Sequence, residues 1–443
     1  MTKLIGRTES LCPDCLVRLP ATLMADGERV RLVKTCPEHG DFSAIVWQGP
    51  PAFASWLRPK IPYQIGTEAI NERGCPFSCG LCARHGQRTC TALVEITRRC
   101  NLHCPVCFAD SGDQAADPSL AELAAMFRRI ISQTGGCNLQ LSGGEPTVRD
   151  DLIEIVHLAK AAGFPFIQLN TNGLHLAAEP ALAASLKAAG LDSIFLQFDG
   201  LDDAVYQRLR GKELFAQKCV AIDASASAGL GIVLVPTIVR GLNSNHLWQI
   251  VEFGLRRQPH VRGVHFQPIS YFGRFPAEFA PDHFTLPELM TELARGSGGL
   301  VATSDFLPPG CEHALCSFSA RYLMAEDGRL TRLGSAACDC RPSPAEKGAL
   351  RAITVTARAW RGPTPAEEAT DRQIIDDLDR FLRRARTHVF TISAMAFQDA
   401  WSLNLDRLQG CCIHVAQADG RLIPFCSYNL TARDGRPLYR RRQ

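Results

Sequence analysis

Three cysteines in one short segment have the spacing of an iron–sulfur site with an open coordination position. Cys100, Cys104 and Cys107 follow an apolar, strand-like run in the pattern CxxxCxxC. Three thiolates from one loop can bind three irons of a 4Fe-4S cube, because soft sulfur ligands favour such clusters. The fourth iron could then bind the amino and carboxylate groups of S-adenosylmethionine (SAM) and pass an electron to its sulfonium. A zinc knuckle is the alternative interpretation.

A glycine-rich segment follows the next strand-like run and could bind a ligand. It reads Ser142, Gly143, Gly144, Glu145, Pro146. Glycines let a backbone approach a ligand closely, and a glutamate can accept hydrogen bonds from an ammonium group. Polar residues at later strand ends could contact ribose, adenine or carboxylate, although each could instead be a turn or cap residue: Asn170, Thr171, Asn172, Gln197, Asp199 and Thr237.

A second cysteine group lies just upstream of the CxxxCxxC segment. Cys75, Cys79, Cys82 and Cys90 fall within one short stretch. Four thiolates can complete a closed 4Fe-4S cluster, which would transfer electrons rather than bind SAM. A structural zinc with the same ligands is the alternative.

The N-terminal segment contains two further metal-binding patterns. Cys12 and Cys15 are separated from Cys36 and His39 by a hairpin-like stretch, Arg29 to Lys34. Two such knuckles can hold one metal tetrahedrally, as in zinc ribbons and rubredoxins. The sequence leaves zinc and iron open.

The C-terminal third has cysteines without a local four-ligand run. We expect Cys311, Cys316, Cys412 and Cys426 to converge on a second auxiliary cluster, with Cys411 a free thiol, since adjacent cysteines point in different directions. Cys338 and Cys340 could join this cluster. Several of these residues could instead be buried free thiols, because free cysteine behaves as a small apolar side chain.

The elements that must position these residues repeat a strand–helix unit. Helices are expected after a capping box at Ser119 and Glu122, and over Leu152–Ala162, begun by Asp150 and ended by Gly163. Six alternating units predict a parallel sheet curled into a partial (β/α)6 barrel, because parallel strands need long crossovers. The strand-like runs are Ala92–Ile96, Asn138–Ser142, Phe166–Asn170, Ser193–Phe198, Gly231–Thr237 and Gly263–Gln267.

Composition and pattern suggest four regions in an α/β chain of 443 residues that is 46% hydrophobic. After about Pro268 the alternation stops, Pro276 to Pro287 reads as a loop, and Thr370–Arg386 has an amphipathic helical pattern. We expect a metal knuckle domain at 1–60, an auxiliary-cluster segment at 61–91, the barrel at 92–270 and a C-terminal auxiliary-cluster domain at 271–443.

Charge and cysteine usage exclude several classes of function. A formal net charge of +3 is far below that of typical nucleic-acid-binding proteins. No apolar run is long enough to cross a bilayer, so we expect a cytoplasmic protein. The cytosol keeps thiols reduced, which makes metal ligation a better explanation for 19 cysteines than disulfides.

Taken together, the motifs resemble the radical SAM superfamily and, more narrowly, its archaeal tetraether synthase and dihydro-hydroxymethylpterin methyltransferase family. The resemblance spans nearly the whole chain, including the GCPxxCGLC element, the GGEP element and the final segment from Ile423 to Asn429. It implies a SAM-cleaving cluster, two auxiliary 4Fe-4S clusters and a rubredoxin-like mononuclear iron. In the superfamily, the GGEP element holds the methionyl amine.

The resemblance also implies a reaction. Cleavage of SAM would give a 5′-deoxyadenosyl radical, which removes hydrogen from an unactivated carbon before a carbon–carbon bond forms. We favour coupling of lipid tails, with methylation of a pterin-like small molecule as the alternative. Two further possibilities are a radical SAM peptide maturase and a non-enzymatic zinc-ribbon interaction protein.

Two kinds of partner are expected. Reduction of the cluster needs an electron donor such as ferredoxin or flavodoxin. The basic stretches Arg380–Arg386 and Arg440–Arg442 could contact anionic head groups at a membrane surface, although a solvated face or a frayed tail is the simpler explanation.

Overall fold

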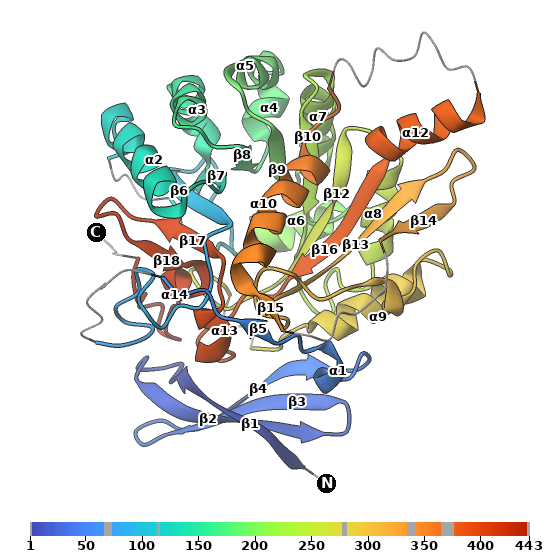
Figure 1. The fold of residues 1–443 in the computed structure, drawn as a ribbon. Helices are drawn as coiled ribbons and strands as arrows, with labels where there is room; N and C mark the ends of the chain where they lie inside the picture. The colour runs from blue at the N-terminus through green and yellow to red at the C-terminus, as the bar shows by residue number, and fades with distance from the viewer. Residues whose placement is uncertain are drawn as a thin grey trace.

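One large sheet organises this computed structural model, which describes residues 2–65, 73–112, 116–276, 281–334, 342–364 and 376–440 (Figure 1). Six of its strands pair in chain order, each parallel to the next. They confirm the expected partial (β/α)6 barrel, with ends within two residues of those expected. The strands are β6 (Thr91–Thr97), β7 (Asn138–Gly143), β8 (Ile167–Thr171), β9 (Ser193–Gln197), β10 (Gly231–Val235) and β12 (Val261–Pro268), and the short β11 (Thr237–Ile238) also pairs with β12.

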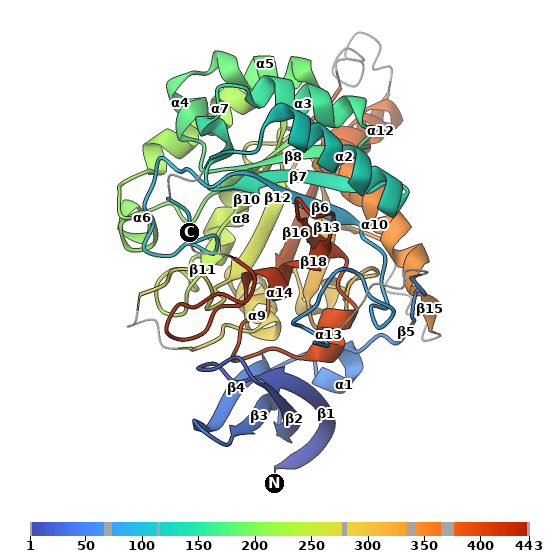
Figure 2. The same cartoon turned by 90° about the vertical axis from the view of Figure 1, so that its left-hand side faces the viewer.

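Helices cover the outer face of this sheet (Figure 2). The capping box before α2 is confirmed, because the Ser119 hydroxyl accepts from the N–H of Glu122 and the Glu122 carboxylate accepts from the N–H of Ser119. The expected start at Asp150 is wrong by one residue: Asp151 is the N-cap, and its carboxylate binds Arg149. These helices are α2 (Leu120–Thr134), α3 (Leu152–Ala161), α4 (Leu174–Ala178), α5 (Ala181–Ala189), α6 (Asp203–Arg210), α7 (Phe215–Ser227) and α8 (Leu247–Leu255).

Strands from the C-terminal third extend the same sheet at both edges. At one edge, β16 (Val389–Met395) runs parallel to β12, followed by antiparallel β13 (Ser317–Met324) and β14 (Leu330–Leu333). At the other edge, β17 (Ile413–Ala416) runs parallel to β6, and β18 (Leu422–Pro424) is antiparallel to β17. Residues beyond 270 therefore complete the barrel sheet.

Helix α10 (Ala345–Trp360) packs against β10, β12 and β16. Close backbone contacts fix both of its ends. A Cβ on Gly348 would lie 2.0 Å from the carbonyl oxygen of Gly310, and one on Gly362 would lie 2.3 Å from that of Gly229. Glycine is required at both contacts, so α10 is held closely against the sheet.

Other elements connect these parts. They are α1 (Phe53–Trp56), β5 (Lys60–Ile61) paired with β15 (Ser343–Pro344), α9 (Leu286–Gly296), α12 (Asp377–Thr387), α13 (Leu405–Gln409), α14 (Phe425–Asn429) and the 3-10 turns Pro146–Val148 and Thr303–Asp305. The expected loop before Pro287 ends slightly earlier than predicted, because α9 begins at Leu286. The part of the Thr370–Arg386 helix before residue 376 lies outside the described residues, as do Arg441 and Arg442.

An antiparallel four-stranded sheet forms the N-terminal region, below the barrel in Figure 1. Its strands are β1 (Lys3–Leu11), β2 (Arg18–Asp26), β3 (Arg29–Cys36) and β4 (Gly40–Gln48). Buried Lys34 joins it to the barrel region by donating to the carbonyl oxygens of Ala400 (2.6 Å) and Trp401 (3.0 Å). Among all described helices, none has the length and apolar character needed to cross a membrane.

Candidate metal centres and substrate cavity

A cavity of about 740 Å³ lies between the inner face of the sheet and α10. Two separate cysteine groups line it: Cys100, Cys104 and Cys107, here called the barrel-loop cysteines, and Cys90, Cys311 and Cys412, here called the cavity cysteines. Cavities of this size suit small-molecule ligands. The arrangement places two potential metal centres in contact with one ligand space.

The barrel-loop cysteines follow the end of β6. The backbone of Cys107 exchanges hydrogen bonds with that of Arg274, and the Arg274 guanidinium donates to the carbonyl oxygen of Cys104 (2.8 Å). Burial raises the pKa of the Cys100 thiol to about 11 and also raises that of Cys104. Metal binding would release these protons. Three thiols facing a cavity fit a cluster that leaves one iron accessible.

Gly143 and Gly144 bring the end of β7 against this loop. A Cβ on Gly143 would lie 2.0 Å from the carbonyl oxygen of Thr97, and one on Gly144 would lie 2.0 Å from that of Arg99. Gly143 also has a φ of 128°, which favours glycine. The close backbone approach expected here is therefore made to the cysteine loop itself.

Glu145 connects two strand ends and borders the cavity. Its Oε1 accepts from the N–H and hydroxyl of Thr147 (3.1 and 2.7 Å) and from the hydroxyl of Thr171 (2.7 Å). Its Oε2 accepts from the N–H of Asn172 (2.7 Å). Among the described residues, Oε2 accepts this single hydrogen bond, so it keeps a lone pair for a ligand.

The other expected ligand-binding residues divide between cavity wall and protein interior. Ser142, Asn170, Asn172, Gln197 and Thr237 line the cavity. The Asn170 side chain donates to Ser142 (3.3 Å), while its Oδ1 is buried without a hydrogen-bond partner, as a ligand-binding group would be.

Asp199 does not contact the cavity, contrary to expectation. It is fully buried, and its Oδ1 lies 2.7 Å from Nη2 of Arg210 and accepts from the N–H of Thr237 (3.0 Å). Burying a lone carboxylate is costly, and the ion pair compensates for this. Arg210 is the partner that reaches the cavity. Pro146 begins the 3-10 turn after β7 and does not line the cavity either.

Lys218, which the sequence did not single out, supports two cavity residues from behind. It is fully buried and donates to the carbonyl oxygen of Asn172 (2.5 Å) and to the Gln197 side chain (3.2 Å). Burial lowers its pKa to about 8. In the sequence it is an ordinary helix lysine, and no local pattern distinguishes it.

The cavity cysteines correct the expected grouping of the auxiliary sites. Their sulfur atoms lie within 4.8 Å of one another, and those of Cys90 and Cys412 are 3.0 Å apart. Cys90 was expected to join Cys75, Cys79 and Cys82, and Cys412 to join Cys316 and Cys426. Pairing of Thr91 with Ile413 in β6 and β17 explains the difference, because it places the preceding residues, Cys90 and Cys412, side by side.

Cys411 does not join the cavity cysteines. Burial raises the pKa of its thiol, which donates to the carbonyl oxygen of Ile413 (3.2 Å). The expectation that Cys412 joins Cys316 and Cys426 is wrong, because Cys412 lies with Cys90 and Cys311, whereas a free thiol at Cys411 stays a prediction.

Cys75, Cys79 and Cys82 line a small hollow with Leu408 and Pro424, and Cys79 lies 3.4 Å from the Ser427 hydroxyl. This hollow adjoins the segment that carries Cys426. Cys338 and Cys340 lie outside the described residues.

The N-terminal ligands lie together as expected from their spacing. Nδ1 of His39 is 3.4 Å from the sulfur of Cys36 and 3.7 Å from that of Cys12, and the sulfur atoms of Cys15 and Cys36 are 3.9 Å apart. All four ligand atoms fall within 4.8 Å of one another. Three thiols and an imidazole fit one tetrahedral metal ion.

Comparisons with known proteins agree with this geometry. Residues 94–254 match the family described as "Radical SAM superfamily", and residues 4–48 match "HMPTM N-terminal zinc ribbon domain". The chain is 33% identical to 7,8-dihydro-6-hydroxymethylpterin dimethyltransferase of Methanocaldococcus jannaschii, over 96% of this chain and 93% of the relative.

More partial similarities also occur. A probable GTP 3′,8-cyclase of Methanothermobacter thermautotrophicus is 32% identical, over 38% of this chain and 55% of its own. The crystal structure of Streptococcus suis SuiB bound to precursor peptide SuiA has a TM-score of 0.41 at 13% identity, covering 48% of this chain and 46% of that one.

Proposed function

We propose, for a chain that belongs to the radical SAM superfamily and to the family of the 7,8-dihydro-6-hydroxymethylpterin dimethyltransferase of M. jannaschii, that the reaction is methylation of a reduced pterin or a closely related heterocycle. Radical SAM proteins bind SAM and a 4Fe-4S cluster, and the barrel-loop cysteines are the residues that would hold that cluster here. When bound, the cluster supplies the electron for reductive cleavage of SAM. A ferredoxin or flavodoxin would in turn reduce the cluster.

The observation that carries the proposal is the shared cavity. It joins the barrel-loop cysteines, the strand-end polar residues and a group of aromatic side chains in one space. The ring centroid of Phe195 lies 5.5 Å from that of His265 and 5.7 Å from that of Trp360, and those of His265 and Trp360 are 5.8 Å apart. Such a wall suits a flat ring.

Residues of the chain would orient the two reactants. The free acceptor on Glu145 and the unpartnered Oδ1 of Asn170 are suited to donors on SAM, such as its amino group. Helix α10 covers the cavity and limits the access of water, which would otherwise quench reactive species.

The proposal is tested with anaerobically reconstituted protein, SAM, a reductant and 7,8-dihydro-6-hydroxymethylpterin. We expect formation of 5′-deoxyadenosine to rise when the pterin is added, and a methylated pterin to be detected by mass spectrometry. Lipids and pterins from cells with and without the protein should differ in the pterins. A change confined to the lipids would refute the proposal.

Lipid-tail coupling is the second candidate, and exposed apolar residues on α12 favour it. Leu378, Phe381 and Leu382 are 61%, 54% and 45% exposed, on a helix that also carries several arginines. An amphipathic helix of this kind can lie on an anionic membrane. Sedimentation with anionic lipid vesicles, lost in Phe381→Ser, would support this candidate.

A further inference from the structure

We propose that the cavity contains an oxyanion-binding wall, formed by Arg321 and Arg351, and that the substrate therefore carries a phosphate or carboxylate group. Both arginines line the cavity that also holds the aromatic group. Arg321 belongs to β13, in the half of the sheet order opposite β17 and β18, and Arg351 belongs to α10. The inference rests on the proposed function only in taking the ring of the substrate to be a pterin or a related heterocycle.

Strand register directs Arg321 into the cavity beside other polar groups. In the sheet, Arg321 pairs with Thr391, which pairs with Gly263 on its other side. The neighbouring row is Ser319, Ser393 and His265. All of these residues except Gly263 line the cavity, and the Thr391 hydroxyl is buried without a hydrogen-bond partner. This face of the sheet is therefore polar where a barrel interior is usually apolar.

Arg332 also lines the cavity, but it pairs with Tyr322 and therefore leaves the sheet on the face opposite Arg321, where its Nε donates to the carbonyl oxygen of Asp305 (3.0 Å). The unpaired polar group on the face of Arg321 is the Thr391 hydroxyl. A buried polar group without a partner is costly, so a bound ligand that hydrogen-bonds to it would stabilise this site.

The half-buried Arg321 and the exposed Arg351 have guanidinium groups that form no hydrogen bond or ion pair with any residue in the described ranges. The carboxylates on this part of the wall are Asp305 and Glu312. Asp305 accepts from the Tyr322 hydroxyl (3.1 Å) and lies 3.9 Å from Arg332, while Glu312 accepts from the Ser317 hydroxyl. The guanidinium groups of Arg321 and Arg351 are thus unpaired, whereas both carboxylates already have partners.

The unpaired guanidinium groups favour an oxyanion as the ligand. Guanidinium groups donate in a planar fork that matches phosphate and carboxylate oxygens, and these bonds strengthen where water is excluded. A phosphate ester of the heterocycle and the head group of a phospholipid share this chemistry. The wall would hold the anionic end of the substrate while the ring contacts the aromatic group.

The test measures binding to the anaerobically reconstituted full-length protein by equilibrium dialysis. The probes are 7,8-dihydro-6-hydroxymethylpterin, its diphosphate ester and sn-glycerol 3-phosphate. We expect the ester to bind at least about tenfold more tightly than the alcohol, and this advantage to be lost in Arg321→Ala and Arg351→Ala.

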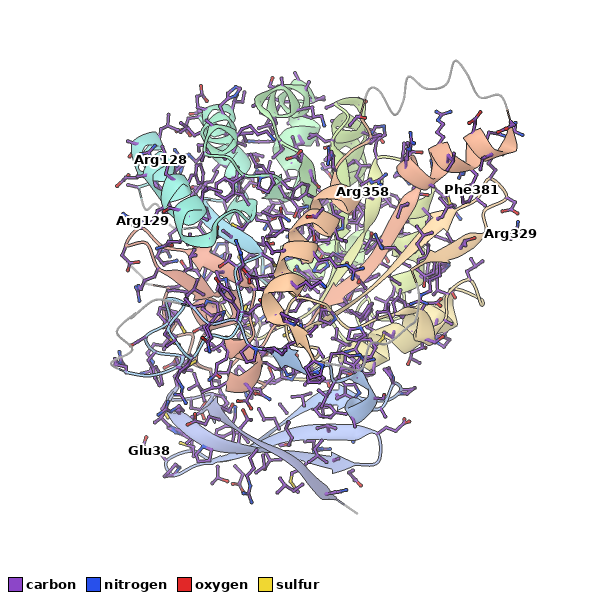
Figure 3. All side chains as sticks on the ribbon, in the orientation of Figure 1. Glu38, Arg128, Arg129, Arg329, Arg358 and Phe381 are labelled. Atoms are coloured by element: carbon purple, nitrogen blue, oxygen red, sulfur yellow. The ribbon has the colours of Figure 1, made fainter. Side chains whose placement is uncertain are left out.

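Two arginines of the same elements provide matched controls, both labelled in Figure 3. Arg329, in the β13–β14 turn, is 81% exposed and paired with Asp327, and Arg358 is exposed on α10. Arg329→Ala and Arg358→Ala should retain the advantage of the ester. Iron content and melting temperature identify any variant that misfolds. If an alanine variant misfolds, Arg321→Lys and Arg351→Lys replace it; they keep the charge and should retain part of the affinity for the ester.

The possible outcomes test the oxyanion-binding wall separately from the pterin assignment. Equal affinity for alcohol and ester, or an ester preference that survives both cavity variants, would overturn the oxyanion wall while leaving the proposed function intact. If glycerol phosphate binds in an Arg321-dependent way and neither pterin binds, the wall is supported and the pterin assignment fails. If none of the three probes binds, the wall is overturned.

Discussion

Cys411 and Cys412 are adjacent in the chain, yet only Cys412 joins the cavity cysteines. Its sulfur lies with those of Cys90 and Cys311 beside the cavity, whereas the Cys411 thiol donates to the carbonyl oxygen of Ile413 (3.2 Å). Side chains on successive residues of an extended segment point in opposite directions. Adjacent cysteines in such a segment are therefore poorly placed to bind the same cluster.

This arrangement predicts two separable losses of iron. Reconstituted protein should hold about twelve cluster irons in three cubes, plus one mononuclear metal. Cys412→Ala and Cys79→Ala should each remove about four irons, with loss of different electron paramagnetic resonance signals, because these cysteines line separate sites. Cys137→Ala, in the apolar core, is the control and should keep all of them. Loss of the same signal in both variants would contradict the assignment.

The barrel-loop cysteines should be essential for SAM cleavage. Cys100→Ala, Cys104→Ala or Cys107→Ala should abolish reductive cleavage of SAM, because each removes a ligand of the cluster that binds it. The iron at the other sites should stay. Cys219→Ala, a half-buried cysteine on α7, should cleave SAM normally. Undiminished 5′-deoxyadenosine from any of the three variants would be incompatible with the site.

Lys218 should make stability depend on pH. Its pKa falls from 10.5 to about 8 on burial, so the unfolded chain binds more protons than the folded chain between these values. The free energy of unfolding should then rise with pH across this window, by up to about 1.4 kcal/mol per pH unit, and the full penalty should remain below pH 8. Lys218→Met should flatten this rise. If the wild type and Lys218→Met showed the same change in melting temperature from pH 8 to 9.5, this contribution of Lys218 would be excluded.

Local spacing determined which site residues could be predicted. The barrel-loop cysteines lie within eight positions and on one loop, so their pattern is visible in the sequence. Cys90 and Cys412 are brought together by strand pairing, which no local pattern reveals. The same holds for Asp199, whose partner Arg210 lies on a helix that follows its strand.

At the scale of elements, α10 depends on glycines at its ends. Gly348→Ala would place a methyl group 2.0 Å from a carbonyl oxygen of the Gly310 segment. We expect destabilisation of about 1–3 kcal/mol from overpacking, more than the gain of up to about 1 kcal/mol in helix propensity. Thermal unfolding of the reconstituted wild type and Gly348→Ala measures this loss of stability.

Gly310→Ala supplies the matched control on the other side of this contact. A Cβ on Gly310 would meet nothing within 4 Å, so this variant should be close to the wild type in stability. If both variants melted at the wild-type temperature, the contact would not hold α10 in place.

The barrel strands could be predicted, whereas the helix that covers them could not. Short runs of Val, Ile, Leu and Phe between helical segments identify parallel strands by composition. The position of α10 follows from contacts of Gly348 and Gly362 with distant loops, and those contacts have no signature in the sequence.

At the scale of the whole molecule, the N-terminal sheet is attached to residues 400–404 by both apolar and polar contacts. Lys34 donates to Ala400 and Trp401, and the Thr8 hydroxyl donates to Asn404 (2.8 Å). Its metal ligands do not line the cavity. The metal site of this N-terminal unit is therefore separate from the cavity.

Removal of the N-terminal metal should loosen this unit alone. Cys36→Ser should lower the metal content by one ion and speed hydrogen exchange in residues 2–48 and at the 400–404 contact, because such metal sites contribute folding free energy. SAM cleavage should continue at a similar rate. Loss of cleavage with all cluster iron present would show that the unit acts on the reaction.

Extension of the sheet at both edges by C-terminal strands sets an order on biogenesis. During synthesis on the ribosome, β6 emerges with one edge unpaired, and its partner β17 is translated far later; Cys90 and Cys412 are 322 positions apart. Until then an open strand edge and an incomplete ligand set are exposed, a state prone to aggregation. The cavity cysteines can therefore bind a cluster together only after almost the whole chain has emerged and the barrel has folded.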